Sequence, residues 1–499
     1  MKAVLLLASA LTAFALDFPM SLAVAPDGHV LVLNAGAKAS ISIVNGPDLP
    51  LPDAFLGLTF APDGKTVYAG GGSRGVIYEF AYAQGELKLT REIKAGDFVG
   101  DVALSPDGRL LYATDLYANL IAVVNPQSGR VIDRFKTGRR PYRILFHPDG
   151  RSYFVSSWAD AAVYQHNAGN GEEIGRIRLG PHATDMAISA YKPEPQEGQP
   201  APDWKYRLFV AAANTNSVYV VGIGDNKTMN VVDSIQVVPA PLSPLGMTPS
   251  ALALSADQKH LYVACSDADA VASVDISDLR GVVEGFIKTG AYPAALRRQG
   301  DQIWVANARG NSVESLGPVT AVQFASGEPF PPMPVEHVIY IIRDTQPVPL
   351  MHAIAGTAPD YTVKMGWRPN FDPGDPANTP LAGYLWTNAV SAGITVRNYG
   401  VFMRNGQAID PGARAFSKPD AAAFFDDLKQ FENTGTMPRL ILIQAANDQT
   451  VEMVKAAIAK SRFANTEIVV GDLRRAEALV GLRPMTRHDR TERTDLQSR

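Results

Sequence analysis

Two carboxylates, Asp344 and Asp448, stand where they could bind a divalent cation. Each follows a continuous apolar run, 338–342 or 440–443, of the kind that forms a buried parallel strand. If these runs are neighbouring strands, their carboxyl ends share one edge of a sheet, and the two carboxylates could hold one weakly bound cation there. A cation held there could activate a water molecule for hydrolysis.

A second candidate group is Asp101, Arg143 and Asp185, which occupy one position of a repeat in the first two thirds of the chain. If this position faces a central channel, Arg143 between two carboxylates could bind a small polar ligand or an anion. The alternative is a set of ion pairs that only line a wet channel. The same position in other repeats holds Ser21, Ala251 and Ala295.

The sequence does not support other catalytic signatures. Residues 70–75 (GGGSRG) match the Gly-x-Ser-x-Gly and Gly-x-Gly-x-x-Gly patterns, but they fall in a loop between repeat strands that no helix follows, so they predict neither a nucleophile elbow nor a phosphate cradle. There is no P-loop motif. The histidines of the last third, His337, His352 and His488, form no His-x-His or Asp-x-x-x-His pattern that could build a metal site. The single cysteine, Cys265, cannot form an internal disulfide.

The elements that position Asp101, Arg143 and Asp185 are repeated strands. Seven segments share a bulky residue that opens an apolar strand and an apolar residue nine positions later. The pairs are Val32/Ile41, Tyr68/Ile77, Tyr112/Ile121, Phe154/Val163, Phe209/Val218, Tyr262/Val271 and Trp304/Val313. Four opening residues follow Pro-Asp-Gly turns, and 255–257 is a degenerate copy of that turn. A period of about 40–50 residues with four short strands predicts an all-β, seven-bladed β-propeller over 17–323.

After Val313 the pattern changes. A Pro-rich linker is expected over 324–334, followed by a smaller α/β domain over 335–489 and a polar tail over 490–499. Strands are expected at 338–342, 440–443 and 467–470. Helices are expected at 449–462, with an apolar face of Val451, Val454, Ile458 and Phe463, and at 472–480.

The repeat motifs at 111–114, 261–264 and 303–307 resemble the YVTN family of bacterial propellers over residues 18–323. The blocks at 335–343, 383–389, 392–400, 437–442, 447–450 and 481–486 resemble the phosphoesterase domain often fused to such propellers, which is of alkaline-phosphatase-like type. The resemblance implies a hydrolase that uses divalent metal ions.

Departures from that pattern lie at the implied metal site. Asp344 could replace a family acid, but Thr345 stands where the family has Asn and Gln449 where it has His. Two further family segments have no counterpart, so the domain is shortened and degenerate. The resemblance therefore favours a domain without a resident metal, with a divalent metal required only if it is active.

Composition gives the remaining expectations. The formal net charge of −4 argues against a nucleic-acid partner. Residues 1–16 have a positive start, an apolar run and a small-x-small site, which predicts a signal peptide and a periplasmic or extracellular protein. The alternative is a buried first strand. No later run is long enough to span a membrane.

The sequence thus predicts a secreted propeller that binds or scaffolds an unknown protein or a small polar ligand on its face. The appended domain would be a phosphoesterase-like pseudoenzyme. Two enzymatic alternatives remain. One is an active metal-dependent phosphoesterase using Asp344 and Asp448, and the other is a lactonase-type hydrolase in the propeller channel.

Overall fold

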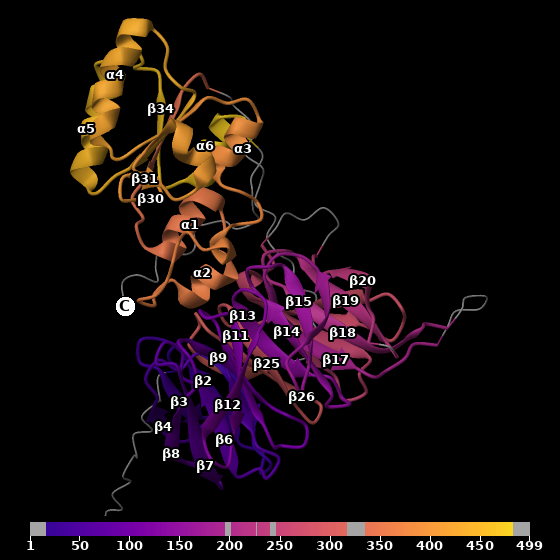
Figure 1. The fold of residues 1–499 in the computed structure, drawn as a ribbon. Coiled ribbons are helices and arrows are strands. Elements are labelled where there is room, and N and C mark those ends of the chain that lie inside the picture. Colours follow the sequence, from indigo (N-terminus) through magenta and orange to yellow (C-terminus); the bar gives the residue numbers. More distant parts are fainter. Residues whose placement is uncertain (1–15, 195–200, 226, 240–245, 317–334, 483–499) are drawn as a thin grey trace, which may run out of the picture.

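The computed structural model describes residues 16–194, 201–225, 227–239, 246–316 and 335–482 (Figure 1). Nearly all of the predicted signal peptide, the linker 324–334 and the tail 490–499 lie outside these residues. The described part contains a seven-bladed propeller and an α/β domain, which Figure 1 shows stacked on one side of the propeller.

Each blade is an antiparallel sheet whose strands follow one another in chain order. Blade by blade, the strands are β1 (Pro19–Val24), β2 (Val30–Asn34), β3 (Ser40–Ile43) and β4 (Asp48–Pro50); β5 (Leu58–Phe60), β6 (Thr66–Gly70), β7 (Val76–Ala83) and β8 (Glu86–Lys94); β9 (Val99–Leu104), β10 (Leu111–Asp115), β11 (Leu120–Asn125) and β12 (Arg130–Lys136); β13 (Pro141–Phe146), β14 (Ser152–Ser157), β15 (Ala162–Asn167) and β16 (Glu173–Arg178); β17 (Ala183–Ser189), β18 (Trp204–Ala212), β19 (Ser217–Gly224) and β20 (Met229–Gln236); β21 (Pro249–Leu254), β22 (His260–Cys265), β23 (Ala270–Asp275) and β24 (Val282–Lys288); and β25 (Pro293–Gln299), β26 (Gln302–Asn307) and β27 (Ser312–Ser315). A short 3-10 helix, η1 (Ser266–Ala268), follows β22.

The predicted pairs fall on the second and third strands of the blades, which confirms the count of seven. In six blades the residue two places after the opening residue pairs with the apolar residue of the motif, as in Gly70↔Ile77 and Thr114↔Ile121. The first blade differs by one residue, with Leu33 opposite Ile41. This constant register places the innermost strands in equivalent positions around the channel.

The Pro-Asp-Gly turns join the first two strands of a blade, and their glycines have the positive φ that such turns require. Gly108, for example, has φ +69°. In the degenerate turn at 255–257 the left-handed position is taken by Gln258 at φ +58°, whose side-chain oxygen accepts hydrogen bonds from Ser189 Oγ and the Ala190 amide.

The α/β domain is built on a parallel sheet of five strands in the order β32-β29-β33-β28-β34. These are β28 (Val338–Ile342), β29 (Val396–Tyr399), β32 (Ser417–Lys418), β33 (Leu440–Gln444) and β34 (Glu467–Val470), and a hairpin consists of β30 (Met403–Arg404) and β31 (Gln407–Ala408). The helices are α1 (Pro347–Ala355), α2 (Asp360–Met365), α3 (Leu385–Ser391), α4 (Ala422–Thr434), α5 (Asp448–Ala459) and α6 (Leu473–Leu479), with 3-10 turns η2 (Pro376–Asn378) and η3 (Pro411–Phe416). The strands and helices expected here are all present.

Two apolar layers cover the sheet. On one side α4 and α5 pack on Ile339, Ile341, Ile441 and Ile443, and the predicted apolar face of α5 is buried there. On the other side α1, α3 and α6 pack on Val338, Tyr340, Ile342, Leu440 and Leu442. The alternation of β28 side chains between the two layers explains why its sequence is a continuous apolar run.

The second apolar layer continues into the propeller. Its cluster includes Phe55, Phe98 and Trp158 from the blades, packed with Tyr361 and Met365 of α2. These propeller residues lie on the face formed by the loops that lead into each innermost strand and the loops that join second to third strands; we call this the docked face. The Pro-Asp-Gly turns form the opposite, open face. Figure 1 shows α1 and α2 between the docked face and the sheet.

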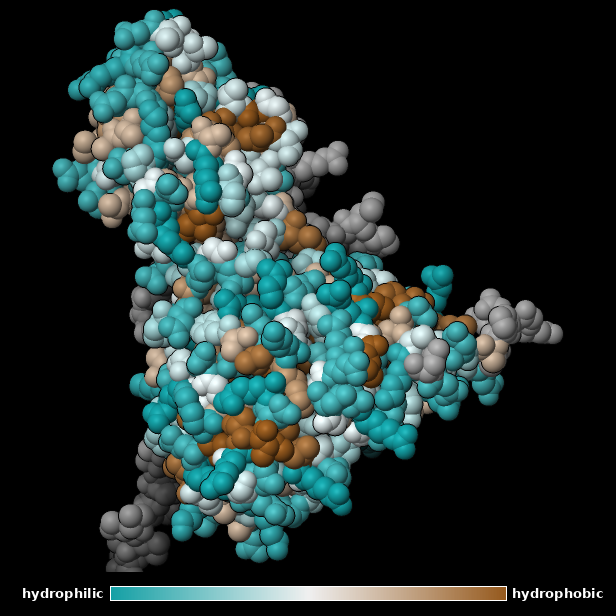
Figure 2. Space-filling model, viewed as in Figure 1, coloured by the Kyte–Doolittle hydropathy of each residue, from teal (hydrophilic) through white to brown (hydrophobic). Residues whose placement is uncertain are grey.

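The surface of the molecule is mostly hydrophilic in the view of Figure 2, with hydrophobic areas that are separate from one another. In the propeller, the large exposed apolar side chains lie on outer strands, at Leu89, Ile132, Ile174, Val231, Val232 and Val282. None of the helices in the described ranges is long and apolar enough to cross a membrane.

Candidate functional site

Asp344 and Asp448 lie at the carboxyl ends of the adjacent strands β28 and β33, as predicted. Asp448 begins α5, and its carboxylate forms an exposed ion pair with Arg343, with 2.8 Å between Nη2 and Oδ1. Over the residues that the structure describes, no group of three or more His, Cys, Asp or Glu side chains is placed to hold a metal ion. Instead, the cationic side chain of Arg343 pairs with the carboxylate of Asp448, which the sequence predicted as a metal ligand.

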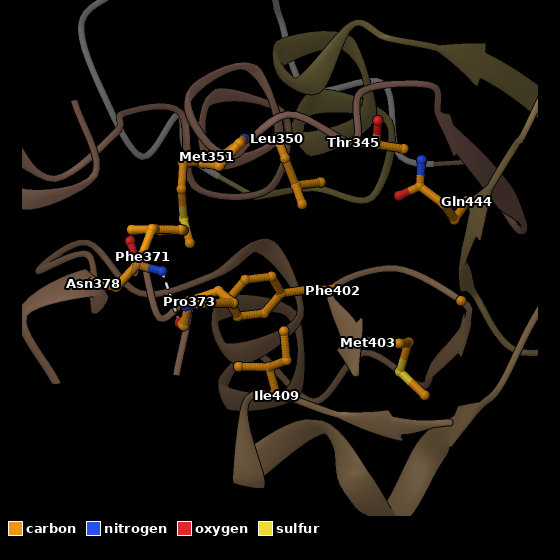
Figure 3. A pocket seen from close by; sticks show the side chains of 12 residues that line it. Thr345, Leu350, Met351, Phe371, Pro373, Asn378, Phe402, Met403, Ile409 and Gln444 are labelled. Atoms are coloured by element: carbon orange, nitrogen blue, oxygen red, sulfur yellow. Dashed lines mark hydrogen bonds between the residues drawn. The ribbon is translucent and has the colours of Figure 1, made fainter. Parts of the chain in front are cut away.

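A pocket of about 270 Å³ opens beside these two strand ends, at the carboxyl edge of the sheet. This edge is where open α/β sheets commonly bind ligands. Its walls come from α1, from the segment after α2, from the β30–β31 hairpin and from the strand ends (Figure 3). The lining residues are Thr345, Pro347, Leu350, Met351, Phe371, Pro373, Asn378, Gly400, Phe402, Met403, Ile409 and Gln444.

Most of the pocket wall is apolar, and its polar groups are few. Gln444 donates from Nε2 to the backbone carbonyls of Ile342 and Asp344, at 3.0 and 3.2 Å. Its amide orientation is thereby fixed, and Figure 3 shows the carbonyl oxygen turned toward the pocket. Asn378 is occupied by its bonds to Thr362 and to the carbonyl of Pro373. The pocket therefore combines apolar walls with one oriented hydrogen-bond acceptor.

Gly400 allows the backbone to pass closely between Asp420 and Gln444 at the edge of the pocket. It has φ +83°, and a Cβ there would lie 3.2 Å from Asp420 Cα and 3.4 Å from Gln444 Cβ. A glycine at the end of β29 thus keeps the backbone turn unstrained and leaves the Gln444 side chain in place.

The structure brings Asp101, Arg143 and Asp185 together in the channel. Arg143 Nη1 lies 3.0 Å from Asp101 Oδ1, and Arg143 Nε lies 3.1 Å from Asp185 Oδ1. Burial alone would lower the pKa of Arg143, but the two carboxylates outweigh it and raise that pKa above its ordinary value. Arg143 therefore stays charged around neutral pH, whereas burial raises the pKa of Asp101 above its ordinary value against the opposing charge of Arg143.

The carboxylates of this cluster also accept hydrogen bonds from other innermost strands. Asp101 Oδ2 accepts from the Ile144 amide and Asp185 Oδ2 from the Leu252 amide, each at 2.9 Å. The cluster thus joins β9, β13, β17 and β21 across the channel. Much of the hydrogen-bonding capacity of Arg143 is used within the protein.

A third polar cluster, which the sequence did not indicate, is buried where α2 meets the docked face. Lys364 Nζ lies 3.0 Å from Asp360 Oδ2 and donates to the Tyr142 hydroxyl at 2.6 Å. The Tyr292 hydroxyl donates to Asp360 Oδ1 at 2.8 Å. Burial would lower the pKa of Lys364, but Asp360 outweighs it and raises that pKa. All four groups are buried, and the bonds from Tyr142 and Tyr292 to α2 link the propeller to the α/β domain.

Several docked-face residues also have left-handed backbone conformations just before an innermost strand. They are Phe18, Arg140, His182, Thr248 and Tyr292, with φ between 52° and 60°. Non-glycine residues rarely adopt this conformation, and it gathers where structure demands a particular side-chain direction. Here it points Arg140 to Asp375 and Tyr292 to Asp360.

Comparison with known proteins gives likenesses of fold. The chain matches no protein-family model and none of the curated proteins. Among solved structures, hydrazine synthase of Kuenenia stuttgartiensis is 17% identical with a TM-score of 0.48 and covers 62% of this chain and 97% of its own. A putative 6-phosphogluconolactonase of Bacteroides fragilis is 18% identical, with a TM-score of 0.44 and coverage of 56% and 86%. The periplasmic gluconolactonase of Pseudomonas aeruginosa is 18% identical, with a TM-score of 0.44 and coverage of 60% and 88%.

Proposed function

We propose that this protein is a binding protein whose small-molecule site is the pocket at the carboxyl edge of the α/β sheet. The observation that carries the proposal is the pocket lining: apolar walls from Leu350, Phe402 and Ile409 face an acceptor oxygen fixed on Gln444. Such a site suits a small, mainly apolar ligand with one hydrogen-bond donor. Met351 and Met403 in the wall adapt to different ligand shapes.

The propeller serves as the scaffold in this proposal, and the α/β domain is a phosphoesterase relative that has lost its metal site. The Arg343–Asp448 ion pair supports that loss, because a guanidinium beside the carboxylate competes with a cation. The apolar pocket wall supports it as well, since a phosphate ester would need cationic or metal partners there. Residues 1–16 support export as a signal peptide.

A fluorescent apolar dye, 1-anilinonaphthalene-8-sulfonate, tests the pocket. We expect it to bind the folded protein, and Ile409→Glu to weaken that binding at least tenfold by placing an anionic side chain in the apolar pocket, where it also repels the sulfonate of the dye. Met453→Glu is the matched control, because Met453 is an exposed side chain on α5, which packs on the other side of the sheet. Equal loss in both variants, or no loss in either, contradicts the proposal.

The phosphoesterase alternative is tested on the same protein. Metal analysis after incubation with Zn²⁺, Mn²⁺ or Ca²⁺, together with hydrolysis of p-nitrophenyl phosphate, should show neither a stoichiometric metal nor turnover. A bound metal or a phosphatase activity that disappears in Asp448→Ala would establish the active enzyme instead.

The second candidate function is lactone hydrolysis in the propeller channel. The observation in its favour is the Asp101–Arg143–Asp185 cluster, which places carboxylates and a guanidinium together in the channel. Turnover of gluconolactone above the uncatalysed rate, lost in Asp185→Asn, would favour this function over binding alone.

A further inference from the structure

We propose that Arg297 forms a second binding site, for a small carboxylate or phosphate anion, inside the propeller channel. Arg297 lies on β25, the innermost strand of the last blade, and its side chain is solvent-exposed. Its Nε donates to the Leu22 carbonyl on the innermost strand of the first blade, at 3.0 Å. That bond anchors the guanidinium and leaves its two terminal nitrogens as a pair of donors.

The charge of Arg297 is not neutralised within the protein. Among the described residues it has no ion-pair partner, because the nearby carboxylates of Asp101 and Asp185 both pair with Arg143. The surrounding blades displace part of the water around the guanidinium and so lower the pKa of Arg297; the charge of Arg143 adds to this shift, and the two carboxylates oppose it. An arginine nevertheless remains protonated in proteins. A confined cation without a counter-ion attracts an anion.

The neighbouring side chains leave the guanidinium accessible. Arg297 pairs across the blade with Trp304, the opening residue of its motif. The residues that pair with the opening residues of five other blades are Thr59, Ala103, Leu145, Ala187 and Ala253. Four of these five side chains are short and the fifth, Leu145, is apolar, so none of the five adds another long polar side chain at this level. The planar fork of a guanidinium matches the two oxygens of a carboxylate or phosphate.

Access to this site is from the open face. Strand β25 runs from the docked face, at Tyr292, toward the turn that joins it to β26 on the open face. Arg297 lies in the second half of that strand, beyond the level of Ala295. The α/β domain covers the docked face only in the contacts described above, so it does not stand between the open face and Arg297. This site is separate from the pocket of the α/β domain.

Titration calorimetry of the full chain with inorganic phosphate and with citrate, at low ionic strength, tests the site. We expect one of the two anions to bind, which distinguishes phosphate from carboxylate recognition, and Arg297→Gln to weaken it at least tenfold. Arg298→Gln is the matched control: it removes the same charge from the next residue, whose guanidinium bonds to its own turn at Gly300. This control should bind like the wild type.

A second variant keeps the test sharp if Arg297→Gln folds poorly. Arg297→Lys retains the charge but loses the fork, so it should bind more weakly than wild type and more tightly than the glutamine variant. Absence of binding for both anions in the wild-type protein overturns the proposal. So does a wild-type affinity in Arg297→Gln, or an equal loss in Arg298→Gln.

Discussion

Single buried charges fix the contact between the α/β domain and the propeller. Asp360 and Lys364 are one helical turn apart on α2, a spacing usually found in exposed pairs. Here the pair is completely buried; Lys364 also donates to the Tyr142 hydroxyl, and Asp360 accepts from the Tyr292 hydroxyl. A buried pair adds little net stability, but losing one member leaves an uncompensated charge.

Asp360→Asn is therefore expected to destabilise the protein by about 3–5 kcal/mol. The amide leaves Lys364 buried without a counter-charge. Denaturant unfolding measures the change. Glu452→Gln on α5 is the control, because its ion pair with Lys455 is exposed, at 2.8 Å between Nζ and Oε1, and its removal should cost well under about 1 kcal/mol. Similar losses in the two variants would show that the buried pair has no special role.

His182 gives the docked face a pH dependence. Burial lowers its pKa from the ordinary 6.5 to about 4, with Asp360 opposing the shift. Between pH 4 and pH 6.5 the unfolded chain binds a proton at this histidine that the folded chain does not bind. The contribution of His182 to the free energy of unfolding is therefore fully present above pH 6.5 and is lost as the pH drops toward 4. The pKa difference between the unfolded and the folded chain corresponds to about 3 kcal/mol in the free energy of unfolding.

Replacing His182 removes this contribution. His182→Asn does not titrate and tolerates the left-handed backbone at this position, where φ is +60°. Unfolding free energies measured from pH 7 to pH 4 should fall less steeply in the variant than in the wild type. Parallel curves for the two proteins would contradict this assignment.

At the scale of the strands, the sequence contained most of the fold because the propeller repeats one local register. A bulky residue, a short loop and an apolar residue nine positions on define a hairpin, and hairpin pairing depends on nearby residues. The strand β28 could also be predicted from the sequence, since burial on both faces makes it continuously apolar.

The sites were harder to predict because their parts are distant in sequence. Tyr142 and Lys364 are separated by 222 residues, and nothing local marks either as buried. The pocket depends on how α1, the β30–β31 hairpin and two strand ends converge. Arg297 did carry a signal: strand alternation places it on the same side as Ala295, which the repeat had already assigned to the channel.

The turns that join the first two strands of a blade make a testable contribution of their own. A Cβ at Gly108, with φ +69°, would lie 2.9 Å from Pro62 Cγ in the preceding blade, whereas one at Gly300, with φ +60°, would meet nothing within 4 Å. Gly300→Ala should cost about 1 kcal/mol from backbone strain alone. Gly108→Ala should cost more in urea unfolding, because the blade contact must also shift. An equal loss of stability in the two variants would show that the contact between Gly108 and the preceding blade contributes nothing to it.

For the whole molecule, the docked face joins two architectures into one core. The cluster that begins at Phe55 and Phe98 in the propeller continues without interruption to Tyr340 in the sheet. Interfaces between domains are more commonly polar and permit relative motion. A continuous apolar core predicts instead that the propeller and the α/β domain unfold together, and it leaves the open face as the side from which the channel is reached.

Arg368 tests this coupling. It is 3% exposed, donates from Nη2 to the carbonyls of Ala54 and Ala35 at 3.0 and 3.4 Å, and stacks over the Phe55 ring at 4.7 Å. Calorimetry of the wild type should show one transition. Arg368→Met should move that whole transition to a lower temperature, because the propeller carbonyls lose their charged donor. The corresponding loss in the free energy of unfolding is about 2–3 kcal/mol. Arg404→Met, at an exposed pair with Asp372, should leave it nearly unchanged. Two wild-type transitions, of which only one moves in Arg368→Met, would mean that the domains are independent and that the docked face is only a contact.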